Sequence, residues 1–244
     1  MGYRNLARSP VGRRLSCERS SDRRPTETTE RSRIMQITRM SSLQEQFGPI
    51  DIYVFDQLLR GNIAPGMRIL DAGCGSGRNL VYLLREGWNV SAVDDNPPAI
   101  EQTRALAASL APTLPVENFR VEPIERMSFP DASFDVVLCS AVLHFSRDDD
   151  HFHAMLQNLW RVLRPGGLFF CRLASTIGMP HRHLTGHRYL APDGAERFCV
   201  DEPFLMQLTA KLNGQLVDPI KTTVVQNQRC MTTWVLEKRT PKRP

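Results

Sequence analysis

Three glycines at alternate positions, Gly73, Gly75 and Gly77, directly follow the apolar run Ile69–Ala72. Glycine permits a sharp turn and lets a ligand approach the backbone closely. Amides exposed where a helix begins also favour a polar or anionic ligand. A nicotinamide-binding loop would need a small residue where this chain has Arg78, and no Gly-Lys-Ser/Thr of a Walker loop follows. The pattern therefore predicts a small-molecule loop that differs from both of these types.

An acidic pair, Asp94 and Asp95, follows the next apolar run, Trp88–Val93. A carboxylate at the end of a buried strand can accept hydrogen bonds from hydroxyl groups of a ligand. Asp94 is the preferred candidate because it ends the strand directly, whereas Asp95 is expected to begin the following helix in solvent. An N-cap role for Asp94 stays open as the alternative.

The histidines allow two kinds of chemistry. His144 follows the apolar run Phe134–Leu138, where it serves as a general base or packs beneath the next helix. His181, His183 and His187 lie close together but without acidic or cysteine partners nearby. A substrate lid or a solvated loop is favoured there over a metal site, and no metal is expected.

Alternating strands and helices must position these residues. The expected strands are Met67–Asp71, Trp88–Val93, Asn118–Val121, Phe134–Leu138 and Leu168–Leu173. The expected helices are a first one over Ile50–Leu59, then Arg78–Glu86, Ala99–Ser109, His153–Leu163 and Glu202–Leu212. Leu216–Val225 and Met231–Leu236 suggest a closing hairpin, and Ser175–Gly194 a loop. Such alternation predicts an α/β fold with a mostly parallel sheet and helices on both faces.

The composition excludes several classes of protein. The 244 residues, 41% hydrophobic and 23% charged, describe one globular domain. The longest apolar runs, such as Val136–Phe145, fall well short of the roughly 18–20 residues that cross a bilayer. Six scattered cysteines without metal-ligand spacing favour a reducing cytoplasm.

The net charge of +5 comes from the beginning of the chain. Residues 1–33 hold nine arginines and four acids, which leaves 22 basic and 22 acidic residues in the remainder. Nucleic-acid enzymes usually carry their basic surface on the domain itself, so nucleic acid is disfavoured as a partner. We expect a disordered tail over 1–33, a domain over 34–239 and a disordered basic end over 240–244; a start at Met35 or Met40 is an alternative.

Four motifs in order resemble the class I S-adenosylmethionine-dependent methyltransferases. They are Leu70–Gly77, Val93-Asp94, Phe129–Val137 and Trp160–Gly167, and the resemblance covers about residues 50–236. The continuation Gly77-Arg78-Asn79 also resembles the tellurite-resistance branch. The resemblance implies a Rossmann-like, seven-stranded sheet closed by a C-terminal antiparallel hairpin.

The resemblance also implies the positions of the cofactor contacts. Asp71 is expected beneath the loop, and Pro123 stands where relatives often have an acid for the adenine amino group. Ile124 or Glu125 is expected to replace it. The full set of expected cofactor-binding residues is Asp71, Gly73, Cys74, Gly75, Gly77, Asp94, Asp95, Ile124, Glu125 and Cys139.

The expected activity is methyl transfer from S-adenosylmethionine to a small-molecule acceptor. Expected acceptor contacts are Tyr53, His144, Arg182 and Arg188, the last two in the long insertion Ser175–Phe198. The alternatives are an RNA methyltransferase that uses the basic tail as an electrostatic arm, and a non-catalytic S-adenosylmethionine-binding protein. Asn96-Pro97-Pro98 imitates a DNA-methyltransferase motif, but it follows the wrong strand and lacks the aromatic residue that would stack on a flipped base.

Overall fold

The computed structural model describes residues 42–179 and 182–240. Several expectations concern residues outside these ranges. They are the tail at 1–33, the alternative starts at Met35 and Met40, His181 and residues 241–244. The described α-helices are α2 (Leu43–Phe47), α3 (Ile52–Leu59), α4 (Val81–Arg85), α5 (Pro97–Leu110), α6 (Asp149–Val162) and α7 (Glu202–Lys211). Short 3₁₀ helices are η1 (Val116–Asn118), η2 (Ile124–Arg126) and η3 (Leu143–Phe145).

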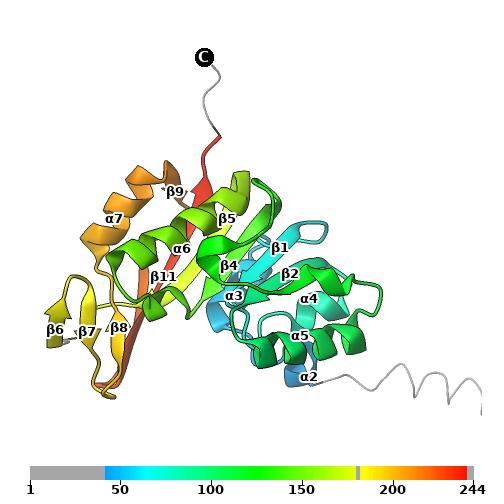
Figure 1. Cartoon of the computed structure of the whole chain (residues 1–244), viewed down its shortest axis with the longest axis horizontal. Coiled ribbons are helices and arrows are strands. Elements are labelled where there is room, and N and C mark those ends of the chain that lie inside the picture. The colour runs from blue at the N-terminus through cyan, green and yellow to red at the C-terminus, as the bar shows by residue number, and fades with distance from the viewer. Residues whose placement is uncertain (1–41, 180–181, 241–244) are drawn as a thin grey trace, which may run out of the picture. The chain divides into compact units, whose positions relative to one another are not determined.

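The main sheet has the strand order β10-β11-β5-β4-β1-β2-β3 (Figure 1). Its strands are β1 (Arg68–Ala72), β2 (Asn89–Asp94), β3 (Phe119–Val121), β4 (Phe134–Ser140), β5 (Leu163–Ala174), β9 (Gly214–Leu216), β10 (Lys221–Val225) and β11 (Arg229–Lys238). β1 to β5 pair in parallel, whereas β11 lies antiparallel to β5. The Rossmann-like α/β fold is confirmed, with a parallel sheet closed by antiparallel strands.

One position of the sheet is filled by two short strands. Both strands pair with β11. β9 pairs with residues 236–238 of β11, and β10 pairs with residues 229–233. Asp218-Pro219 lies between them, and a proline cannot donate to a strand ladder. Eight strands therefore occupy seven positions, and the first arm of the expected hairpin is interrupted.

Helices cover both faces of the sheet (Figure 1). On one face α6 and α7 pack through Phe152, Leu159 and Leu205 against Leu70 and Val137 of the sheet. On the other face α3, α4 and α5 pack against the intervening strand positions, such as Ile69 and Val136. Successive residues of β1 and β4 thus point to opposite sides, and burial of both sides explains why these strands are almost wholly apolar.

Three elements differ from their expected form. Residues 75–80 form turns, so α4 begins at Val81 and not at Arg78. α6 begins earlier, at Asp149, because the Asp148 side chain accepts a hydrogen bond from the His151 amide and caps the helix. The expected loop after β5 forms a small antiparallel sheet of β6 (Arg182–Thr185), β7 (Arg188–Leu190) and β8 (Glu196–Phe198).

No helix within residues 42–179 and 182–240 is both long and apolar enough to cross a membrane.

Candidate active site

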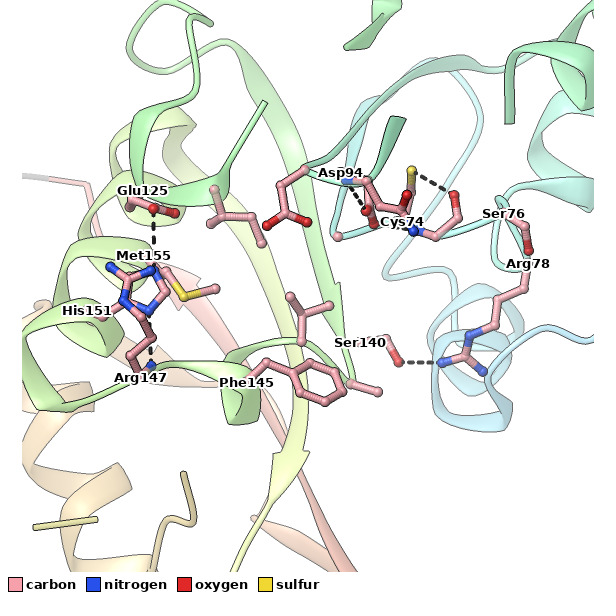
Figure 2. A pocket seen from close by; sticks show the side chains of 17 residues that line it. Cys74, Ser76, Arg78, Asp94, Glu125, Ser140, Phe145, Arg147, His151 and Met155 are labelled. Atoms are coloured by element: carbon pink, nitrogen blue, oxygen red, sulfur yellow. Dashed lines mark hydrogen bonds and ion pairs between the residues drawn. The ribbon is translucent and has the colours of Figure 1, made fainter. Parts of the chain in front are cut away.

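A cavity of about 650 Å³ opens at the carboxyl ends of β1, β2, β3 and β4 (Figure 2). Parallel α/β sheets bind their ligands at this edge. The glycine loop and Asp94 form one side, and Glu125, His151 and Met155 form the other. The lining residues are Gly73–Ser76, Arg78, Asp94–Asn96, Ile124, Glu125, Ser140–Val142, Phe145, Arg147, His151 and Met155.

The glycine loop is tied to the end of β2. The amides of Gly73 and Cys74 donate to the carbonyl oxygen of Val93 at 2.8 and 3.0 Å. Gly73 has φ +74°, and a Cβ there would lie 2.5 Å from a methyl group of Val142. The first turn of the loop therefore requires glycine.

The later glycines of the loop have different roles. Gly75 lines the cavity, and a Cβ on it would meet no atom within 4 Å. Gly77 does not line the cavity; a Cβ there would approach Leu106 and Thr103 of α5 at 3.1 and 3.2 Å. Gly75 thus leaves room for a ligand, whereas Gly77 permits close packing of the loop on α5.

The Asp94 carboxylate lines the cavity and also holds its loop. One oxygen accepts a hydrogen bond from the Gly75 amide at 2.8 Å, and the other accepts one from the Asn96 amide at 3.0 Å. Each carboxylate oxygen has a further lone pair for a hydroxyl group. Asp95 is exposed and also lines the cavity. Both expected acids therefore lie at this rim, and only Asp94 is bonded to the glycine loop.

The Asp71 side chain is buried at the end of β1. It is 1% exposed, and neither carboxylate oxygen has a hydrogen-bond partner among the described residues. Burial raises the pKa of the Asp71 carboxyl to about 7, although the nearby Arg78 guanidinium acts in the opposite direction. Asp71 does not line the cavity, so its charge can act on a ligand only across the loop.

The opposite wall combines η2 with the beginning of α6. His151 Nε2 lies 3.4 Å from a carboxylate oxygen of Glu125, and His151 Nδ1 accepts a hydrogen bond from the Arg147 amide at 3.1 Å (Figure 2). Ile124 and Met155 supply the apolar surface. Ile124 and Glu125 were expected from the sequence, but His151 and Met155 were not, because only the fold brings α6 beside η2.

Asp51 forms a buried polar centre beneath the cavity. The side chain is 3% exposed and caps α3 by accepting a hydrogen bond from the Tyr53 amide. It also accepts hydrogen bonds from Ser140 Oγ at 2.8 Å and from the Arg172 guanidinium at 3.2 Å. The Arg78 guanidinium lies 3.6 Å away. Nothing in the sequence pattern around Asp51 indicated this role.

A second cavity of about 350 Å³ adjoins the first, and Arg78 and Ala141 line both. Ala141 directly follows β4 with φ +65°, and its amide donates to the Arg172 carbonyl oxygen at 2.7 Å. His144 lies in this second cavity. It is 5% exposed, and its Nδ1 has no hydrogen-bond partner among the described residues.

The other expected acceptor contacts line neither cavity. The Tyr53 hydroxyl is hydrogen-bonded to Thr223, and its ring faces the Arg172 guanidinium. Arg188 donates to the Ser146 carbonyl oxygen and pairs with Glu196, while Arg182 is exposed on β6. The insertion instead contributes Ala191, Asp193 and Arg197 to the second cavity.

Two further expectations concern cysteine and histidine side chains. Cys139 is buried inside β4 and does not line the first cavity. His187 pairs with Asp149 and stacks on Phe204, whereas His183 is bonded to the Gly186 carbonyl oxygen. Among the described residues, no group of three or more His, Cys, Asp or Glu side chains is placed to hold a metal ion.

These features fit S-adenosylmethionine. Asp94 offers a carboxylate to a ribose, Asp71 is an unpartnered carboxylate beneath the loop, and the Gly75 position leaves open space beside the loop. Ile124 and Met155 offer apolar surface for a flat ring.

Residues 70–171 match the model of a methyltransferase domain. Over 105 residues the chain is 35% identical to the uncharacterized methyltransferase YodH of Bacillus subtilis, covering 43% of this chain and 42% of YodH. It is 38% identical over 105 residues to a ubiquinone biosynthesis O-methyltransferase of Methylocella silvestris, covering 43% of this chain and 39% of that protein. The matches thus span about half the length of these curated relatives or less.

A solved structure shares the fold over almost the whole chain. It is the 1,6-didemethyltoxoflavin-N1-methyltransferase of Burkholderia thailandensis with bound 1,6-didemethyltoxoflavin and S-adenosylhomocysteine. The TM-score is 0.60 at 22% identity, covering 95% of each chain. The domain match, the identity to named methyltransferases and the shared fold agree with the cavity at the glycine loop. Over residues 70–171 the chain is thus similar to a methyltransferase domain, and its named relatives are methyltransferases.

Proposed function

We propose that this chain transfers a methyl group from S-adenosylmethionine to a small-molecule acceptor. The proposal rests on the hydrogen bond that joins Asp94 to the glycine loop at the edge of the cavity. One carboxylate both closes the loop, through the Gly75 amide, and faces a cavity large enough for a nucleoside. Relatives with named small-molecule substrates support the acceptor class.

Each part of the cavity has a separate task in this proposal. Asp94 binds the ribose hydroxyls, Asp71 balances positive charge beneath the loop, and Ile124 with Glu125 borders the adenine. S-adenosylmethionine supplies a methyl group on a sulfonium that is already reactive. The protein then mainly orients the acceptor and excludes water, and it needs no nucleophilic side chain of its own.

Calorimetric titration with S-adenosylhomocysteine tests the cofactor site. Asp94→Ala and Asp94→Asn are expected to weaken binding by about ten- to a hundredfold, because one or two charge-assisted hydrogen bonds are lost. Asp94→Asn keeps an oxygen for the Gly75 amide, so it separates ribose binding from loop closure. Asp95→Ala is the matched control, with an expected change of less than about threefold.

Two results would contradict this assignment. Unchanged affinity in a folded Asp94→Asn protein would move the ribose contact elsewhere, and a large loss in Asp95→Ala would assign it to Asp95. Release of S-adenosylhomocysteine across a panel of small acceptors, RNA and proteins then tests catalysis. Binding without release over the whole panel would favour a non-catalytic S-adenosylmethionine-binding protein.

A further inference from the structure

The second cavity differs from the first in its charge. Four arginines line it, Arg78, Arg172, Arg197 and Arg229, against a single carboxylate, Asp193. They come from the glycine loop, β5, the insertion and the beginning of β11, which are far apart in the chain. Such convergence of guanidinium groups on one small space costs electrostatic free energy unless anions offset it.

The carboxylates nearby offset only part of this charge. Asp193 pairs with Arg197 through both oxygens, at 2.8 and 2.9 Å. Asp51 faces both Arg78 and Arg172, so two guanidinium groups share one carboxylate. Arg229 has no ion pair with any side chain in the described part of the chain. The cavity therefore keeps a surplus of positive charge.

Two buried nitrogen atoms in the cavity lining lack partners. Arg172 Nε and His144 Nδ1 make no hydrogen bond within the described residues. A buried N–H without an acceptor costs about 1–3 kcal/mol, and more when the group is charged. Both atoms are covered by the protein, so the charge of the Arg172 guanidinium is incompletely compensated beside the cavity.

The state of His144 agrees with a positive potential in this space. Burial, together with repulsion from Arg197 and Arg172, lowers the pKa of the His144 imidazole to about 4. The imidazole is therefore neutral near pH 7, and it adds no positive charge to the four guanidinium groups.

We propose that the second cavity binds the carboxylate or phosphate of an anionic small molecule, which is the methyl acceptor of this chain. This inference rests on the proposed function. Arg78 and Ala141 line both cavities, so a molecule bound in the second cavity lies beside the proposed cofactor site. Guanidinium groups match the geometry of both oxyanions. The volume of about 350 Å³ limits the ligand to a compact molecule.

Calorimetric titration with benzoate, inorganic phosphate and the neutral benzamide tests the inference on the full chain. Benzoate or phosphate is expected to bind at least about tenfold more tightly than benzamide, because only the anions offset the arginines. The two anions distinguish a planar carboxylate from a phosphate group. Equal affinity for all three probes would overturn the proposal.

Single substitutions locate the site. Arg197→Gln and Arg172→Lys are expected to weaken binding of the preferred anion by about tenfold, and the exposed Arg229→Gln by about threefold. Arg182→Gln, an exposed arginine that lines neither cavity, is the matched control and is expected to have no effect. Arg229→Gln keeps the test informative if Arg172→Lys fails to fold. Anion affinity that is unchanged in all three cavity variants would overturn the proposal.

Titration of the same samples with S-adenosylhomocysteine separates the two proposals. Anion binding without S-adenosylhomocysteine binding would reject the proposed function and leave an anion site. S-adenosylhomocysteine binding with no preference for anions would reject the inference and leave the proposed function intact.

Discussion

The first cavity is built largely from backbone and short loops at the ends of adjacent parallel strands, whereas the second is built from side chains of distant elements. In the first, Gly73, Gly75 and Asp94 lie within one β-α-β unit formed by β1, α4 and β2. In the second, Arg78, Arg172, Arg197 and Arg229 come from four separate parts of the chain. The difference suggests that this fold can keep the backbone of one ligand site unchanged while substitution of single side chains alters the neighbouring site.

The largest expected effect comes from the backbone of the first cavity. Gly73→Ala places a Cβ 2.5 Å from Val142 at a residue with φ +74°. We expect a loss of about 2–5 kcal/mol in unfolding free energy and at least about a hundredfold loss of S-adenosylhomocysteine affinity. Chemical denaturation and calorimetry measure the two.

Gly61→Ala is the matched control for this change. Gly61 also has positive φ, at +73°, but a Cβ there would meet no atom within 4 Å. Only the cost of the backbone conformation remains, about 1 kcal/mol, with unchanged cofactor affinity. If both variants behaved alike, the contact with Val142 would have no special role.

The next effect concerns the buried, unpartnered carboxylate of Asp71 beneath the glycine loop. The pKa of Asp71 is raised to about 7 by burial, above its unfolded value of 3.8. The ligand-free folded state therefore holds this proton more tightly than the unfolded state, and Asp71 destabilises the protein increasingly as pH rises through this window. Relative to wild type, Asp71→Asn should gain about 2–3 kcal/mol in unfolding free energy between pH 5 and pH 8.

Denaturation midpoints of the two proteins across this pH range provide the measurement. Arg78, Asn79, Asp94 and Asp51 are the groups that act on Asp71 from the neighbouring elements, and all are kept in the variant. A stability difference that does not change with pH would show that Asp71 is ionised at little cost.

Replacement of His144 in the second cavity should give a smaller gain in stability, with the opposite dependence on pH. Its pKa is lowered to about 4, below the unfolded value of 6.5. On acidification the unfolded state gains a proton before the folded state, so His144 destabilises the fold as pH falls through this window. Relative to wild type, His144→Gln should gain about 2 kcal/mol between pH 7 and pH 5.

Together these two variants sharpen the comparison, because the destabilisation by Asp71 grows and that by His144 shrinks as pH rises from 5 to 7. Arg172 and Arg197 are the charged groups that act on His144. A His144→Gln protein whose stability follows the wild type at every pH would place the imidazole in contact with water.

The same contrast explains what could be predicted from the sequence. Asp94 and the glycine loop were predictable because strand, turn and carboxylate follow one another within about 25 residues of chain. The alternation of strands and helices predicted the layers, and the family resemblance implied a sheet closed by a hairpin. The predicted strands lie close to those of the structure, apart from the early start of β5 and the interruption between β9 and β10.

The second cavity could not be predicted in this way. Arg172 and Arg229 meet only because β5 and β11 are neighbours, and the Arg197 contribution depends on how the insertion folds. Arg182 and Arg188 have the same chemistry and lie in the same insertion, yet they line neither cavity. Residue type indicated acceptor contacts in the insertion, but side-chain direction, which the sequence does not show, decides which arginines contribute.

The Asp51 carboxylate also bears on where this protein can be divided. The stretch that matches the family model, residues 70–171, excludes Asp51 and ends within β5. A fragment cut at these limits would leave the buried Ser140 and the partly exposed Arg78 without their shared acceptor, and a buried hydrogen-bonding group without its partner costs about 1–3 kcal/mol. It would also leave β5 without β11, exposing an unpaired strand edge to other chains. Residues 70–171 are thus fewer than the fold requires, and a fragment limited to them would be prone to aggregate.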